Sequence, residues 1–206
     1  MTSRTHLFRF VGLVFVWLIP CFALWMSLGS PVTWPAVRAS EMLLTAWMPG
    51  LVSSFTLSGT DALLLTQYGE LNGEIVAART AGYNLGFHLN TRILSYSLPF
   101  YAALHFATPQ DNSGTRFMFG LMVLYPLLIL CLVSLGLKTL MVELGPVFAS
   151  QTVSLLPNQE AIAIMYQIST LIIPPLAPVL VWAWQSQTNP KLLALLSDKP
   201  APIPGN

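Results

Sequence analysis

The chain has 206 residues, of which 54% are apolar and only 8% are charged, whereas about a quarter of the residues of an ordinary soluble domain are charged. Nine Lys and Arg residues against eight Asp and Glu residues give a formal net charge of +1 without a basic block, which excludes the electrostatic surface that nucleic-acid binding needs. The composition therefore predicts an α-helical integral membrane protein with the lipid bilayer as its solvent and no nucleic-acid partner.

The first apolar run, residues 10–28, contains no charge and is long enough to cross a hydrocarbon core of about 30 Å as a helix. Arg4 and Arg9 precede it, so the positive-inside rule predicts that residues 1–30 form a cytoplasmic N-terminus and the first transmembrane helix. A cleaved signal peptide is the alternative, because small residues stand at cleavage-like positions within residues 27–29.

Residues 31–50 are predicted to form an amphipathic helix that lies on the membrane surface. Several apolar positions share one helical stripe: Ala36, Ala39, Leu43, Ala46 and Trp47. Trp47 also suits the interfacial zone in which aromatic rings gather. Arg38 and Glu41 have the i,i+3 spacing of an ion pair on one side of a helix.

Residues 51–92 change to an apolar period of two, which is typical of half-buried strands. Asn72-Gly73 stands between two such runs and is the strongest short-range signal for a β-hairpin, while Gly59-Thr60-Asp61 supplies an earlier turn. We predict a three- or four-stranded antiparallel β meander on the periplasmic, non-cytoplasmic side. About 40 residues make a poor independent core, so this meander is expected to lean on the preceding helix, the membrane or another protein.

Residues 93–185 are predicted to hold three further transmembrane helices, which brings the total to about four. Residues 93–107 form the second span, which is short and carries several polar side chains, so a re-entrant course is the alternative to a full crossing. Residues 117–137 form the third span and residues 162–184 the fourth. An even number of spans places both termini in the cytoplasm, and residues 186–206 are predicted to form a disordered cytoplasmic tail.

Three prolines interrupt the fourth span: Pro174, Pro175 and Pro178. Each proline removes a backbone N–H donor, and in lipid the carbonyl groups left free must find partners on neighbouring helices, water or polar side chains. The cluster therefore favours a helix that packs against other helices, in this chain or in a partner.

Chemistry-bearing motifs are missing from the sequence: every Asp, Glu, Lys and Arg falls outside or at the edge of a predicted span, and no catalytic, phosphate-binding or metal-binding motif occurs. His105 stands near the end of the second span without a carboxylate in reach, which is typical of an interfacial side chain. We expect no catalytic residue, no cofactor and no metal. A membrane thiol enzyme is the alternative, with Cys21 or Cys131 as nucleophile and His88 as base.

Two stretches carry a likeness to a known family: residues 90–109, NTRILSYSLPFYAALHFATP, and residues 166–184, YQISTLIIPPLAPVLVWAW. They resemble the exosortase H-associated membrane protein family, and a looser likeness includes WMPGLV from Trp47. On this basis we assign an interaction or structural role to eight residues: Tyr166, Gln167, Pro174, Pro175, Pro178, Pro99, Asn90 and Trp47.

The resemblance implies an accessory protein of the bacterial inner membrane that is encoded with an exosortase. An exosortase is the polytopic cysteine transpeptidase that processes proteins bearing a C-terminal sorting signal. The expected function is therefore a non-enzymatic accessory in protein sorting, with the exosortase or its substrates as partner. A structural subunit of another envelope assembly, for secretion or conjugation, is the alternative from a different class.

Overall fold

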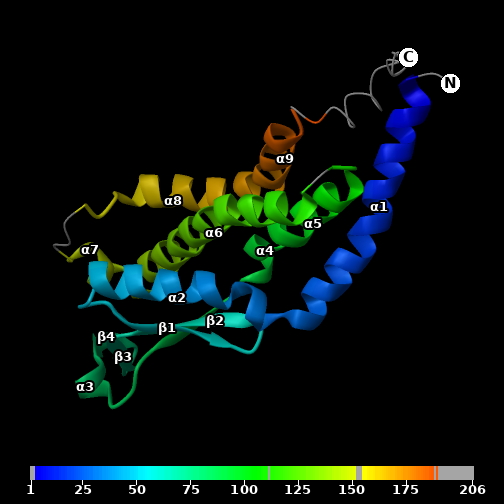
Figure 1. Cartoon of the computed structure of the whole chain (residues 1–206). Helices are drawn as coiled ribbons and strands as arrows, with labels where there is room; N and C mark the ends of the chain where they lie inside the picture. Colours follow the sequence, from blue (N-terminus) through cyan, green and yellow to red (C-terminus); the bar gives the residue numbers. More distant parts are fainter. Residues whose placement is uncertain (1–2, 111, 152–154, 188, 190–206) are drawn as a thin grey trace, which may run out of the picture. The chain divides into compact units, whose positions relative to one another are not determined.

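The computed structural model describes residues 3–110, 112–151, 155–187 and 189 (Figure 1). The protein is mostly helical and contains a small antiparallel β region, as the sequence predicted. The predicted tail, residues 186–206, lies almost entirely outside the described residues.

The chain divides into two compact units. The first, called the helical unit here, comprises Met1–Ser27, Tyr96–Leu124 and Pro175–Asn206. The second, called the sheet unit, comprises Leu28–Ser95 and Tyr125–Pro174. Each unit is therefore assembled from segments that lie far apart in the sequence.

The helical unit contains four helical segments. They are α1 (Ser3–Leu28), α5 (Ser97–Ala107), the part of α6 (Ser113–Leu144) up to Leu124, and most of α9 (Ile173–Ser186). Its core is a cluster of apolar side chains on α1, α5 and α9: Val14, Leu104 and Ala107, with Phe10, Leu18, Phe100, Val179 and Trp182 packed against them. Phe10 stacks on Trp182 with ring centroids 5.6 Å apart, which ties α1 to α9.

Three helices among the described residues are long and apolar enough to cross a membrane: Phe8–Leu28, Ser113–Leu144 and Gln159–Ser186. They contain the first, third and fourth predicted spans. The second predicted span, residues 93–107, is divided between α4 (Arg92–Ser95) and the 11-residue α5. At 1.5 Å per residue, α5 covers roughly half of a hydrocarbon core of about 30 Å. The second crossing, and with it the count of four, stays a prediction.

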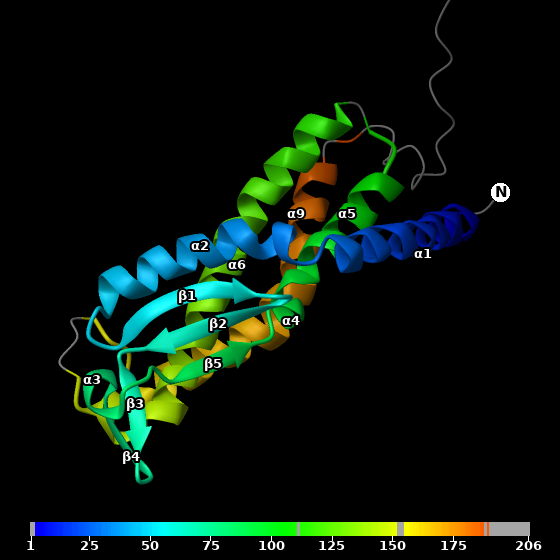
Figure 2. The ribbon, with the colours of Figure 1, turned by 90° about the horizontal axis from the view of Figure 1, so that it is seen from below.

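The sheet unit is built around a three-stranded antiparallel sheet of β1 (Val52–Ser58), β2 (Asp61–Thr66) and β5 (Gly86–Leu89), in the order β1-β2-β5 (Figure 2). Phe55 pairs with Leu64, and Leu64 with Phe87, so apolar side chains run across the sheet. The apolar period of two was therefore a correct signal for this region.

A separate hairpin of β3 (Tyr68–Leu71) and β4 (Glu74–Ala77) is inserted between β2 and β5. Its turn is the predicted Asn72-Gly73, whose φ angles of 54° and 84° are those of a two-residue hairpin turn. The predicted three- or four-stranded antiparallel meander is thus present as a three-stranded sheet, with this hairpin as a second, separate sheet. Where β2 passes into β3, the Thr66 hydroxyl accepts a hydrogen bond from the Tyr68 N–H at 3.3 Å. A short helix, α3 (Ala78–Ala81), follows the hairpin.

The helix predicted over residues 31–50 is present as α2 (Ser30–Trp47), which lies along β1 (Figure 2). Its buried face also meets α6, since a Cβ at Gly136 would lie 3.3 Å from the Leu44 Cδ1. The buried positions of the helix and its C-cap are Thr33, Ala36, Val37, Ser40, Leu44 and Met48. Leu43 and Ala46 of the predicted stripe are exposed, and their contact with the membrane surface stays a prediction. Helix α2 is thus the support that the small β region was expected to need.

The chain continues from α6 through α7 (Pro146–Ala149) to a long broken helix made of α8 (Gln159–Gln167), η1 (Ile168–Ile172) and α9. η1 is a π-helical turn in which the Ile173 N–H bonds the Ile168 carbonyl. Pro174 and Pro175 follow and have no N–H to donate, so the α-helical ladder cannot continue through them. The predicted interruption is therefore present, in the form of a π turn.

Candidate functional site

Polar side chains gather in the helical unit where α5 ends, α6 begins and α9 ends. We call this cluster the polar clasp; its members are Tyr101, His105, Thr108, Gln110, Ser113, Arg116, Trp182 and Gln185. The ends of helices leave backbone groups without intrahelical partners, and side chains are the usual means of satisfying them. The clasp lies where three such ends meet.

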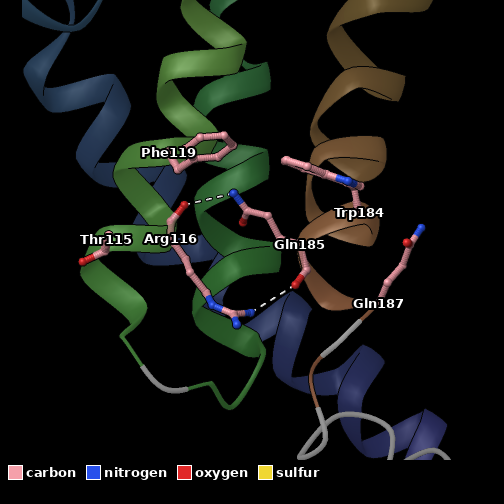
Figure 3. A pocket seen from close by; sticks show the side chains of 6 residues that line it. All are labelled: Thr115, Arg116, Phe119, Trp184, Gln185 and Gln187. Carbon is pink, nitrogen blue, oxygen red and sulfur yellow. Dashed lines mark hydrogen bonds between the residues drawn. The ribbon is translucent and has the colours of Figure 1, made fainter.

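Arg116 and Gln185 form its centre through reciprocal hydrogen bonds (Figure 3). The Arg116 Nη1 donates to the Gln185 backbone carbonyl at 3.1 Å, and the Gln185 Nε2 donates to the Arg116 carbonyl at 3.0 Å. A cation beside the last carbonyls of α9 is also favourable for the helix dipole. The Tyr101 hydroxyl lies 2.9 Å from the Gln185 Oε1, to which it donates. These bonds fix the start of α6 to the end of α9.

His105 is buried in the clasp, with 1% of its surface exposed, so its interpretation as an interfacial side chain was wrong. Its Nε2 lies 2.9 Å from the Ser113 carbonyl, which assigns the ring proton to Nε2. The Nδ1 is then free to accept from the Gln110 Nε2 at 3.1 Å. Both ring nitrogens are therefore engaged in holding the loop between α5 and α6.

Trp182 connects the two stretches of sequence that carry the family resemblance. Its Nε1 donates to the Thr108 Oγ1 at 2.7 Å, and the Thr108 hydroxyl donates in turn to the Leu104 carbonyl at 2.8 Å. Asn189 adds a further link, because its Nδ2 donates to the Pro109 carbonyl at 3.0 Å. The end of the first stretch and the end of the second thus form one site.

Close packing of Tyr101 on α6 holds the clasp in place. The Tyr101 ring is fully buried and stacks on Phe117 at 5.7 Å between centroids. It lies directly against Gly120, where an added Cβ would overlap the phenol ring and hydroxyl. Glycine at this position therefore allows the close approach of α5 to α6.

A pocket of about 440 Å³ opens beside the Arg116–Gln185 pair (Figure 3). Its walls come from the first turns of α6 and from the end of α9: Thr115, Arg116, Phe119, Trp184, Gln185 and Gln187. The Phe119 and Trp184 rings lie 5.7 Å apart and form an apolar rim, with the Arg116 guanidinium and the amides at the other side. The pocket is thus amphipathic, with a cationic end.

Comparison with known proteins gives a match to one family model, that of the exosortase H-associated membrane proteins, over residues 4–189. The chain belongs to this family. The family name describes membrane proteins associated with exosortase H, which agrees with the three apolar helices of the structure. No curated protein and no solved structure matches the chain.

The eight residues singled out from the sequence are divided between the two units. Pro99, Pro175 and Pro178 belong to the helical unit, where Pro99 and Pro178 are buried and Pro175 is exposed. The other five belong to the sheet unit: Asn90, Trp47, Tyr166, Gln167 and Pro174. The assignment of roles to these residues stays a prediction.

Two of the five residues in the sheet unit, Asn90 and Tyr166, make contacts typical of structural roles. The Asn90 Oδ1 accepts from the Arg92 N–H at 2.9 Å and so turns the chain into α4. The Tyr166 ring lies under the Lys138 ammonium, 5.5 Å from the ring centroid, which is a cation–π geometry. Gln167 is exposed, Trp47 is half-buried at the end of α2, and Pro174 is buried.

Sequence reasoning missed most of the polar clasp. Tyr101 and His105 have the i,i+4 spacing of neighbours on one helical face, which was a usable signal for a shared polar site. Arg116 and Gln185 gave no such signal, since 69 residues separate them.

Proposed function

We propose that this chain is a non-enzymatic accessory of the exosortase H system, held in the bacterial inner membrane, where it contacts the exosortase or its substrates. The family match carries the proposal, because it extends over residues 4–189 and so includes segments of both units. A membrane partner suits the outer surface of α1, where large apolar side chains are exposed, among them Phe15, Val16 and Ile19. Such a surface needs lipid or the helices of a partner to cover it.

The arrangement of the reactive side chains supports a non-enzymatic role. Both nitrogens of His105 are engaged by Ser113 and Gln110, so neither is left to act as a base. Cys131 is only 1% exposed, which makes it a poor nucleophile for a substrate that arrives from outside. The burial of Cys131 and the bonds that engage His105 support the accessory role.

Co-purification from native membranes tests the partner. A tagged chain should enrich the exosortase, or its substrates, after mild cross-linking and mass spectrometry, compared with an untagged strain. The Cys21→Ala, Cys131→Ala double variant should enrich the same partner. It should also restore protein sorting in a strain that lacks the chain. Enrichment of a secretion or conjugation assembly instead would contradict the proposal, and a failure of the double variant to restore sorting would favour the thiol enzyme.

The proposed topology places the N-terminus in the cytoplasm and the β region, residues 51–92, on the non-cytoplasmic side. Reporter enzymes that are active on only one side, fused after Asn90, Gln110, Gln151 and Lys191, test it directly. Asn90 and Gln151 should read outside, and Gln110 and Lys191 inside. An outside signal at Gln110 would show that residues 93–107 do not cross.

A further inference from the structure

The pocket beside the polar clasp lies at one end of two candidate spans. Helix α6 has 32 residues, so at 1.5 Å per residue it is longer than a hydrocarbon core of about 30 Å by several turns. Thr115 and Arg116 fall in its first turn, and Gln185 lies next to the last residue of α9. These positions belong at the level of the lipid headgroups.

Arg116 makes the pocket selective for an anion, because it is the only charged side chain among the described residues of the lining. One of its N–H groups donates to the Gln185 carbonyl, which leaves further guanidinium N–H groups for a ligand. Among the residues that the structure describes, no carboxylate forms an ion pair with Arg116. The ion pair among those residues joins Arg38 to Glu41 in α2. A guanidinium binds two oxygens of a phosphate at once, so a phosphate group is the anion that suits it best.

The opposite wall of the pocket continues into the apolar surface of the same helices. Phe119 and Trp184 are 47% and 56% exposed, although both are large aromatic residues. Leu180 lies one turn before Trp184 on α9 and is 57% exposed, so it shares the face of the tryptophan. An apolar strip thus leads from the cationic end of the pocket along the span, which is the order of groups in a phospholipid.

We propose that this pocket binds an anionic phospholipid, with its phosphate on the Arg116 guanidinium and one acyl chain along Phe119, Trp184 and Leu180. Thr115 and Gln187 lie on the polar side, where their side chains suit the glycerol hydroxyls of a headgroup such as that of phosphatidylglycerol. A volume of about 440 Å³ lies within the usual range for small-molecule sites. The bound lipid would also cover the exposed rings, and its binding does not depend on the exosortase.

Native mass spectrometry of the whole chain in neutral detergent micelles tests the site. The protein is exposed to equal amounts of phosphatidylglycerol and phosphatidylethanolamine, and the two bound populations are compared. Arg116→Gln removes the charge but keeps an N–H donor for the Gln185 carbonyl. Gln187→Glu places a negative charge in the pocket, which should repel an anionic lipid. Because Gln187 is exposed and outside the clasp, this variant can test binding even if Arg116→Gln unfolds the protein. Arg92→Gln, at an exposed arginine of α4, is the matched control.

Both lipids offer a phosphate to Arg116, but the ammonium of phosphatidylethanolamine is repelled by the guanidinium. The wild type and Arg92→Gln should therefore bind phosphatidylglycerol about tenfold more strongly than phosphatidylethanolamine. Arg116→Gln and Gln187→Glu should each lose most of that preference. Equal binding of the two lipids by the wild type would overturn the proposal, as would a preference that survives Gln187→Glu. Inorganic phosphate that binds as tightly as the lipid would show that free phosphate, and not a lipid, is the ligand.

Discussion

The sheet unit and the helical unit are held together by different kinds of hydrogen bond. In the sheet unit the strands bond through their backbones, and the turns that join β1 to β2 and β3 to β4 contain glycines with positive φ angles, Gly59 and Gly73. In the helical unit the helix ends are joined by side chains, above all Tyr101, Arg116 and Gln185. The sheet should therefore tolerate most single side-chain changes, whereas the helical unit should depend on a few.

The largest effect is expected from Gly120→Ala in α6. The new Cβ would overlap the Tyr101 ring, which cannot move aside because it is stacked on Phe117 and bonded to Gln185. Overpacking of this kind costs about 1–3 kcal/mol, which outweighs the gain in helix propensity from alanine. The midpoint of thermal unfolding in detergent micelles should fall accordingly.

Gly12→Ala is the matched control, since Gly12 is also helical and has no atom within 4 Å of an added Cβ. Its unfolding midpoint should stay the same or rise slightly. Equal behaviour of the two variants would mean that the contact between α5 and α6 is looser than the structure shows.

A smaller effect is expected from Tyr101→Phe, which keeps the ring and removes only the hydroxyl. The Gln185 Oε1 would lose its 2.9 Å partner within a largely buried site, at a cost of about 1–2 kcal/mol. The midpoint of thermal unfolding in detergent micelles should fall by less for Tyr101→Phe than for Gly120→Ala.

Tyr83→Phe makes the corresponding change in the sheet unit. The Tyr83 hydroxyl also donates a hydrogen bond, to the Glu70 carbonyl at 2.9 Å, but Tyr83 is 51% exposed. Water can replace that bond, so we expect a change below about 0.5 kcal/mol. If Tyr83→Phe destabilised the protein as much as Tyr101→Phe, side-chain bonds would matter equally in both units.

This difference between the units also explains how much of the structure could be predicted from the sequence. The hairpin turn at Asn72-Gly73 and the strands around Phe55 could be predicted, because turn residues and the apolar period of two are patterns of neighbouring residues. The three long apolar helices follow from length and composition alone. These parts of the fold were predicted from residues that are neighbours in the chain.

The candidate site could not be predicted in the same way. His105 looked solitary because its partners, the Ser113 carbonyl and Gln110, are contributed by a loop whose path depends on tertiary packing. The pairing of Arg116 with Gln185 depends on where α9 ends relative to α6 within the unit. Likewise, the end of β2 at Thr66 involves a hydrogen bond from the Tyr68 N–H to the Thr66 hydroxyl, which the apolar period does not predict.

A last comparison concerns Arg38 and Glu41, the ion pair predicted from sequence spacing and confirmed in α2. Glu41 has a second role that the spacing did not indicate: its Oε1 accepts from the Phe55 N–H at 3.3 Å and so links α2 to β1.

Arg38→Ala breaks only the ion pair, and since the Arg38 side chain is 55% exposed, we expect a loss below about 0.5 kcal/mol. Glu41→Ala breaks the same pair and also leaves the Phe55 N–H without its acceptor, so it should cost about 1 kcal/mol and speed amide exchange at Phe55. Hydrogen exchange read by mass spectrometry on the peptide that contains β1 distinguishes the two variants. If both accelerate exchange equally, the ion pair itself, and not the bond to Phe55, couples α2 to the sheet.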